Sequence, residues 1–197
     1  MTHSKQLGSK LISLLLAFAM ILALMPAVSL TASAEADALY TLTSDKQQLG
    51  DGWTWNGKTL HFFGSGTYDC SKNYFYISSA KDNAAEINVS GSLTVNIPQD
   101  ITSFVTSDCE LDIRGAGVIN LSYTGNGIAT LFNVPDSPIT YAGGAICSDD
   151  NAYIFYCSQL TMDKGSIDAP KSCFKVKERY DINNSSVSVA YFGSINN

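Results

Sequence analysis

The chain has 197 residues, with 12 Lys plus Arg against 18 Asp plus Glu, and its formal net charge is −6. An acidic surface repels phosphate backbones, so this balance argues against a nucleic-acid partner. A negative net charge does not exclude neutral sugars as ligands, and an acidic surface could bind cations. No linker or low-complexity tract divides the chain beyond its leader, so one domain with its own core is expected.

Residues 1–34 have the three-part pattern of a secretory signal peptide. Lys5 and Lys10 give a positive start, residues 11–24 are almost entirely apolar, and Ala32-Ser33-Ala34 is a small-x-small cleavage signature. An uncleaved membrane anchor is the alternative, although the apolar run is short for a bilayer span. We expect a secreted, extracellular protein with no membrane span after cleavage. Its 10 basic and 18 acidic residues would then give a net charge of −8.

Residues 35–72 are expected to form an N-terminal β cap. Trp53-Thr-Trp55-Asn-Gly57 is an aromatic pair followed by an Asn-Gly turn, and Leu60-His-Phe-Phe63 has the pattern of the returning strand of a hairpin. Trp53 and Trp55 are two positions apart, so in a strand they point the same way. Their rings could stack on sugars, or they could cover the open end of a core.

Residues 73–197 contain a recurring motif. Its copies are Leu111-Asp-Ile-Arg-Gly-Ala-Gly-Val118, Ile139-Thr-Tyr-Ala-Gly-Gly-Ala-Ile146, Leu160-Thr-Met-Asp-Lys-Gly-Ser-Ile167 and Tyr180-Asp-Ile-Asn-Asn-Ser-Ser-Val187. Each copy has apolar residues at its ends and turn-forming residues between them, without helical periodicity. A unit that recurs about every twenty to thirty residues indicates a solenoid, in which stacked copies bury a face that one copy cannot.

Three short strands per unit, stacked in parallel, predict a parallel β-helix of about five coils. The expected inward columns are Phe104, Phe132, Phe155, Phe174; then Leu111, Ile139, Leu160, Tyr180; then Val118, Ile146, Ile167, Val187. A β-sandwich also uses short alternating strands, but it would not explain copies of one motif in phase. A leucine-rich repeat would require a stricter leucine-asparagine pattern.

The segment from Trp53 to Leu60, followed by units such as that at Leu111, resembles secreted bacterial right-handed parallel β-helix proteins of the pectate-lyase-like, carbohydrate-binding type. The resemblance rests on repeat style over most of the chain after the leader. It implies a right-handed β-helix and an extracellular role on polysaccharides, sometimes with calcium. The chain differs from that group in being short and in ending without an obvious cap, so an exposed strand edge could pair end to end with another copy.

Polar residues follow the apolar anchors on the expected outer face. They are Asp112, Arg114, Asp163, Asp181 and Asn183. The last three are expected on adjacent coils, where oxygen ligands would suit Ca²⁺ or sugar hydroxyls, although a solvated face requires polar residues in any case. We include all five, together with Trp53 and Trp55, as candidate carbohydrate-binding residues.

No catalytic residues are predicted. A lyase needs a base and a bound cation, and no second carboxylate is expected on a neighbouring coil beside Asp112 and Arg114, because the matching positions are Thr140 and Ala142. The acidic pair Asp149-Asp150 is expected in a turn between strands. A hydrolase needs two carboxylates on opposite sides of a groove, so this pair is not predicted to be catalytic. His61 is the only histidine after the leader, which argues against a Ser-His-Asp system.

The five cysteines match no zinc pattern, and an odd number leaves at least one unpaired. Cys157 falls at a position where neighbouring units have Val134 and Val176, so it is expected in the core. A disulfide elsewhere stays open, because stacked strands lie within disulfide reach.

The sequence therefore predicts a secreted, non-catalytic module that binds a polysaccharide or cell-surface glycan, with Ca²⁺ as the cofactor that its acidic column would suit. A polysaccharide lyase or glycoside hydrolase is one alternative. A structural surface or adhesin segment is another.

Overall fold

The computed structural model describes residues 38–64, 66–69 and 73–194. The predicted leader, residues 1–34, lies outside the described residues, as does Cys70. Within the described ranges the regular structure is β-strand, apart from one short 3-10 turn, η1 (Lys81–Asn83). The prediction of an all-β chain is confirmed. Over these same ranges, no helix has the length and apolar character needed to cross a membrane.

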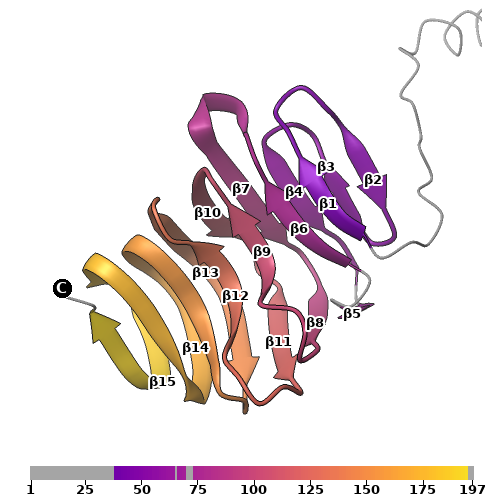
Figure 1. The fold of residues 1–197 in the computed structure, drawn as a ribbon. Helices are drawn as coiled ribbons and strands as arrows, with labels where there is room; N and C mark the ends of the chain where they lie inside the picture. Colours follow the sequence, from indigo (N-terminus) through magenta and orange to yellow (C-terminus); the bar gives the residue numbers. More distant parts are fainter. Residues whose placement is uncertain (1–37, 65, 70–72, 195–197) are drawn as a thin grey trace, which may run out of the picture. The chain divides into compact units, whose positions relative to one another are not determined.

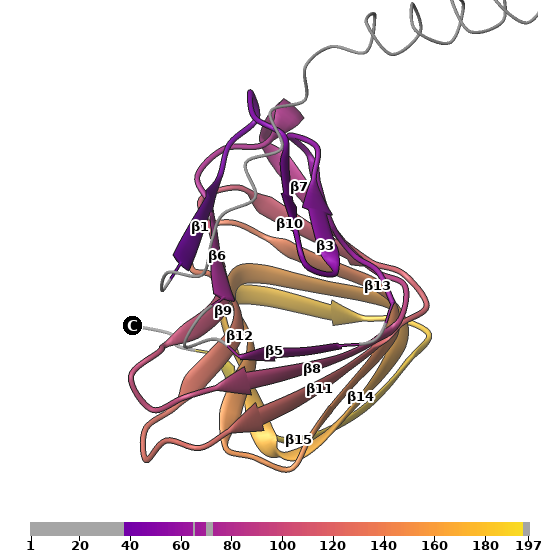
Figure 2. The same cartoon turned by 90° about the vertical axis from the view of Figure 1, so that its right-hand side faces the viewer.

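Fifteen strands form one sheet that passes along three sides of a shared interior (Figures 1 and 2). The first side contains β1 (Ala38–Leu42), β6 (Asn73–Ile77), β9 (Ser103–Ser107) and β12 (Ala129–Val134). The second contains β2 (Gln48–Gly50), β3 (Trp53–Trp55), β4 (Thr59–Phe62), β7 (Ala84–Val89) and β10 (Glu110–Arg114). The third contains β5 (Gly66–Asp69), β8 (Ser92–Ile97) and β11 (Val118–Tyr123). The strands β13 (Ile139–Ser148), β14 (Ala152–Ile182) and β15 (Ser185–Ser194) bend and contribute to more than one side.

Pairing between successive strands on each side is mostly parallel, which gives the sheet a solenoid-like character. Antiparallel pairs among the described strands are β2–β3 and β3–β4. Strands β1, β4 and β5 pair in parallel with β6, β7 and β8, so the predicted cap region already contributes to the stack. The sheet is therefore mixed rather than purely parallel.

The interior consists of columns of apolar side chains that lie in register on neighbouring strands. Leu111, Ile139 and Leu160 are paired in that order, and none of them is more than 1% exposed. The ring of Phe155 lies 6.0 Å from that of Phe132 and 5.3 Å from that of Phe174, centroid to centroid. The predicted columns Leu111, Ile139, Leu160 and Phe132, Phe155, Phe174 are thus confirmed. Their side chains share one side of the sheet because alternate residues of a strand point the same way.

Two of the predicted inward positions are wrong, and a third residue, Phe104, is buried as predicted but is not the register partner of Phe132. Phe132 pairs with Val105 rather than Phe104, and both neighbours are buried because β9 does not alternate strictly. Ile119, not Val118, pairs with Ile146, since the turn in that unit is one residue longer.

The second wrong position lies in the last copy of the motif. Tyr180 is 46% exposed, and Ile182 is the residue of this stretch that packs against the core. Repeat spacing alone could not locate a one-residue shift or identify which apolar residue of a copy faces inward.

The turns between the second and third sides need backbone angles that few residues adopt. Gly115, Gly143 and Gly165 have φ values of 110°, 145° and 105°, and Asn184 has 49°. A Cβ on Gly144 would lie 2.6 Å from the carbonyl oxygen of Gly117, so the successive turns approach too closely for a side chain there. The predicted glycine and asparagine turns are confirmed.

The predicted hairpin is formed by β3 and β4. The side-chain Oδ1 of Asn56 accepts hydrogen bonds from the amides of Lys58 at 2.9 Å and Thr59 at 2.7 Å, which closes the turn around Gly57. Both Trp53 and Trp55 point into the core and are 1% exposed.

The four described cysteines, Cys109, Cys147, Cys157 and Cys173, are free thiols. Cys157 is fully buried, as predicted, and pairs with Val134 on the adjacent strand. Burial raises the pKa of the Cys157 thiol from 9.0 to about 12, because the thiolate would lose its hydration.

Candidate functional site

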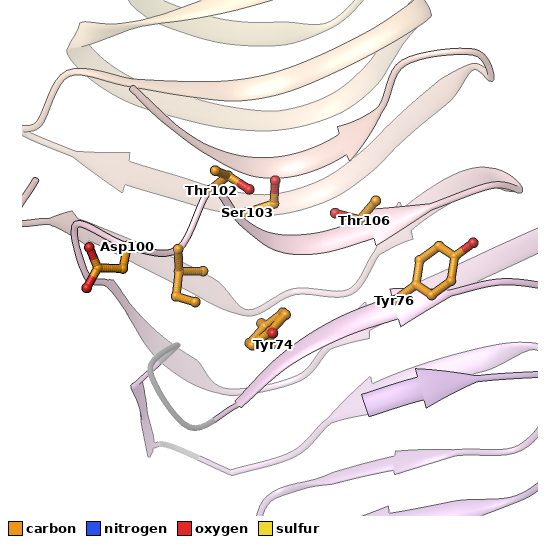
Figure 3. Close-up of a pocket in the computed structure, with 7 residues that line it drawn as sticks. Tyr74, Tyr76, Asp100, Thr102, Ser103 and Thr106 are labelled. Carbon is orange, nitrogen blue, oxygen red and sulfur yellow. The ribbon is translucent and has the colours of Figure 1, made fainter. Parts of the chain in front are cut away.

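A pocket of about 350 Å³ opens on the outer surface of the first side, between β6 and β9 (Figure 3). Its lining residues are Tyr74, Tyr76, Asp100, Ile101, Thr102, Ser103 and Thr106. Figure 3 shows the two tyrosines along one strand and the hydroxyl residues on the neighbouring segment. The pocket therefore combines ring surface with hydroxyl and carboxylate groups, so it offers both apolar and polar contacts to a ligand.

Strand geometry places both tyrosines outward. Tyr74 and Tyr76 alternate with the buried residues Phe75 and Ile77, so their rings emerge on the same surface of β6. Thr106 pairs with Tyr76 on the next strand, and it therefore emerges beside Tyr76. The segment before β9 forms the remaining wall, with a backbone hydrogen bond of 3.1 Å from the Ile101 amide to the Pro98 carbonyl.

The hydroxyl of Tyr76 donates a short hydrogen bond to Asp108 Oδ2. This hydrogen bond raises the pKa of Tyr76, because the phenol is the form that can donate to the carboxylate. Asp108 thus fixes the direction of the Tyr76 ring. A ring that is held before a ligand arrives loses little rotamer entropy on binding.

None of the residues that line this pocket is among the candidate residues predicted from the sequence. The segment Tyr74-Phe-Tyr-Ile77 forms β6, and its alternation of residues indicates two outward tyrosines. The register between β6 and β9 was the missing information, because the recurring motif becomes recognisable only from Leu111 onwards.

The structure does not place Trp53 and Trp55 in any site. The side chain of Trp53 packs edge to face against Tyr40 and Phe75, and the indole nitrogen of Trp55 donates to the Thr43 carbonyl at 2.8 Å. Neither ring offers an exposed face to a sugar. Their burial agrees with the alternative that they close the core, so we do not retain them as carbohydrate-binding residues.

Asp112 and Arg114 lie on the outer surface of the second side, as predicted. The guanidinium of Arg114 donates to Asp112 Oδ2 from both Nε, at 2.7 Å, and Nη2. This contact raises the pKa of Arg114. The expected lack of a second carboxylate is wrong, because Glu86 on the preceding strand is the register partner of Asp112.

Asp163 and Asn183 lie on adjacent coils, since the amide of Asn183 donates to the carbonyl of Met162 at 2.7 Å. Asp181 is in an ion pair with Arg179, 2.8 Å from its Nη2. Asp163 falls at a register shift between β13 and β14. Across the described part of the chain, no group of three or more His, Cys, Asp or Glu side chains could hold a metal ion.

The acidic pair Asp149-Asp150 forms a turn, as expected. Asp150 Oδ2 accepts from the amide of Tyr123 at 2.8 Å, and the Asp150 carbonyl accepts from the hydroxyl of Ser172 at 2.7 Å. His61 Nε2 lies 3.1 Å from Ser90 Oγ. These residues hold neighbouring strands together.

Comparison with known proteins gives no match: no family model, no curated protein and no solved structure is similar to this chain.

Proposed function

We propose that this protein is a secreted, non-catalytic module that binds a neutral glycan in the pocket between β6 and β9. The coils that carry the pocket would wind as a right-handed parallel β-helix, as in the pectate-lyase-like proteins that the sequence resembles. The observation that carries the proposal is the pairing of two half-buried tyrosine rings, Tyr74 and Tyr76, with the hydroxyl groups of Thr102, Ser103 and Thr106.

This combination suits a sugar because a pyranose has apolar C–H faces and a rim of hydroxyl groups. Aromatic rings provide apolar surface with a defined direction. Hydroxyl side chains both donate and accept, so they can pair with sugar hydroxyls in either sense. The exposed Asp100 carboxylate adds a stronger acceptor at one end of the pocket.

Charge favours a neutral ligand. The sequence pI is about 4.7, and the pocket itself contains a carboxylate and no basic side chain. A polyanionic glycan would meet repulsion there, whereas a neutral one would not.

Binding is tested by titrating residues 35–197 against neutral and acidic polysaccharides in a calorimeter, with calcium and then with chelator. We expect saturable binding to at least one neutral polysaccharide, no new reducing or unsaturated ends, and no effect of chelator. Tyr76→Ala should weaken binding, while Tyr191→Ala, at an exposed tyrosine of β15 that is not among the lining residues of the pocket, serves as the matched control. Absence of binding to every polysaccharide would favour a structural surface segment instead.

A glycoside hydrolase is a second candidate function, because Glu86 and Asp112 are in register on adjacent strands. Adjacent strands are about 4.8 Å apart, and retaining glycosidases hold their two carboxyl groups about 5–5.5 Å apart. Asp112, held by Arg114, would be the nucleophile, and Glu86 would be the acid. New reducing ends that disappear in both Glu86→Gln and Asp112→Asn would establish this activity over binding alone.

A further inference from the structure

The pocket is the first part of a longer row of outward side chains. Tyr76 pairs with Thr106, Thr106 pairs with Asn133 on β12, and Asn133 pairs with Tyr156 on β14. All four side chains are half-buried, and each is flanked along its strand by two buried residues. We call this row of Tyr76, Thr106, Asn133 and Tyr156 the outer strip.

The outer strip has an aromatic residue at each end and polar residues between them. Neighbouring strands are about 4.8 Å apart, so three steps separate Tyr76 from Tyr156 by about 14 Å. The strip crosses the strands of the first side, which lie next to one another in Figure 1. A ligand that touches both ends must therefore be extended and must run across the strands.

The ring at the far end is held in place, as Tyr76 is at the near end. Lys175 Nζ lies 4.1 Å from the centroid of the Tyr156 ring and 5.6 Å from that of Tyr153. Lys175 belongs to the later stretch of β14, which pairs with β15, and so it approaches Tyr156 from the side opposite β12. Lys177 Nζ also lies 5.8 Å from the centroid of the Tyr156 ring, and cation–π contacts of this kind restrain the ring.

The pocket alone is small for a glycan chain. Its volume of about 350 Å³ is near the lower end of the usual range for ligand pockets. A polymer whose one unit occupies the pocket has further units outside it. The outer strip provides polar contacts at Thr106 and Asn133 and then a second ring, in the order that a linear chain would meet them.

We propose that the outer strip binds a linear, neutral polysaccharide chain that lies across β6, β9, β12 and β14, with one unit in the pocket and a later unit against Tyr156. This inference rests on the proposed function and names the form of ligand that the same site would take. It predicts that affinity depends on chain length, because contacts at both ends act together only when one molecule spans them.

The test is a calorimetric titration with size series of neutral oligosaccharides (cello-, xylo-, manno- and malto-), from the monosaccharide to the hexasaccharide. For the series that binds, affinity should rise by roughly tenfold or more between the shortest and the longest ligand, a difference of about 1.4 kcal/mol. Tyr156→Ala should remove most of that rise and leave the affinity for the shortest ligands unchanged. Tyr76→Ala should weaken binding at every length.

Two further variants keep the test decisive. Asn133→Thr, which retains a strand-forming residue, should reduce the gain with length even if Tyr156→Ala is unstable, and Tyr191→Ala should change nothing. Affinity that is equal for all lengths, or a length dependence that survives Tyr156→Ala and Asn133→Thr, would overturn the outer strip while leaving the pocket as a site. Failure of the unaltered protein to bind any member of the series would overturn both proposals.

Discussion

Two outer surfaces of this protein are built by the same strand alternation but differ in how their polar groups are used. On the second side, Arg114 donates to Asp112, and Glu86 lies beside this ion pair. On the first side, Tyr74 and Tyr76 border a pocket whose hydroxyl and ring surfaces face outward. The position of a residue on its strand therefore determines whether its side chain faces outward. The side chains beside it determine whether its polar groups are already paired within the protein or can contact a ligand.

The comparison also explains why charge was a poor guide to the site. The charged residues of the second side were conspicuous in the sequence, and they are the ones that pair with one another. The tyrosines of the first side were inconspicuous, and they surround the pocket. Interactions between exposed charges contribute little to stability, so an ion pair there is weak evidence for any role.

The largest expected effect comes from the interior that supports both surfaces. Trp55→Ala should lower the free energy of unfolding by about 3–5 kcal/mol, since it removes a fully buried aromatic side chain. Urea denaturation followed by circular dichroism measures this change, and Thr54→Ala, at the intervening outward position, is the matched control. If the Trp55→Ala protein were stable but had lost its glycan affinity, Trp55 would instead be a carbohydrate-binding residue, as the sequence suggested.

A second test uses the pH dependence of unfolding to measure the contribution of a buried side chain, Cys157, to stability. The pKa of Cys157 is raised from 9.0 in the unfolded chain to about 12 in the folded protein. Its stabilising contribution is thus fully present below pH 9 and decreases by about 1.4 kcal/mol per pH unit as pH rises towards 12. Cys157→Val, which copies Val134 and Val176 of the neighbouring units, should show a shallower alkaline loss in urea denaturation. If the free energy of unfolding fell equally steeply with pH in both proteins, the raised pKa of Cys157 would be wrong.

At the pocket, two variants measure the contributions of the Tyr76 ring and of its hydroxyl to binding separately. Tyr76→Ala should weaken glycan binding by roughly tenfold or more, as expected for a central aromatic contact. Tyr76→Phe keeps the ring and removes the donor to Asp108, and it should weaken binding by less than about threefold. Calorimetry with the same polysaccharide measures both. Equal losses in the two variants would show that the hydroxyl, not the ring, makes the contact.

The smallest effect is expected on the charged surface. Arg114→Ala and Asp112→Asn should each change the free energy of unfolding by no more than about 1 kcal/mol, because the pair is partly exposed. Neither variant should alter glycan affinity. A clear loss of glycan binding in both variants would place the site on the second side instead of at the pocket.

Much of the fold could be predicted because the sequence repeats its own pattern. The column Leu111, Ile139, Leu160 and the left-handed turns at Gly115, Gly143 and Gly165 follow from motif spacing and from the backbone freedom of glycine. One-residue shifts such as that at Ile119 could not be predicted, because they depend on how long each turn is.

The candidate site could not be predicted for a different reason. Its residues come from β6, from β9 and from the segment before β9, and strand pairing between them joins positions about thirty residues apart. The alternation around Phe75 showed that Tyr74 and Tyr76 face outward, but not which residues lie opposite them. Aromatic character also suggested Trp53 and Trp55, although large apolar rings more often fill a core than a surface.

The glycan site on the first side is tested most directly by hydroxyl-radical footprinting of residues 35–197, with and without a saturating neutral polysaccharide found by the titration. We expect the ligand to protect Tyr74, Tyr76 and Tyr156 from oxidation. We expect no change at His61 and Phe63, near the second side, or at Tyr191. Protection at His61 and Phe63 with unchanged tyrosine oxidation on the first side would show that the glycan does not bind at the pocket.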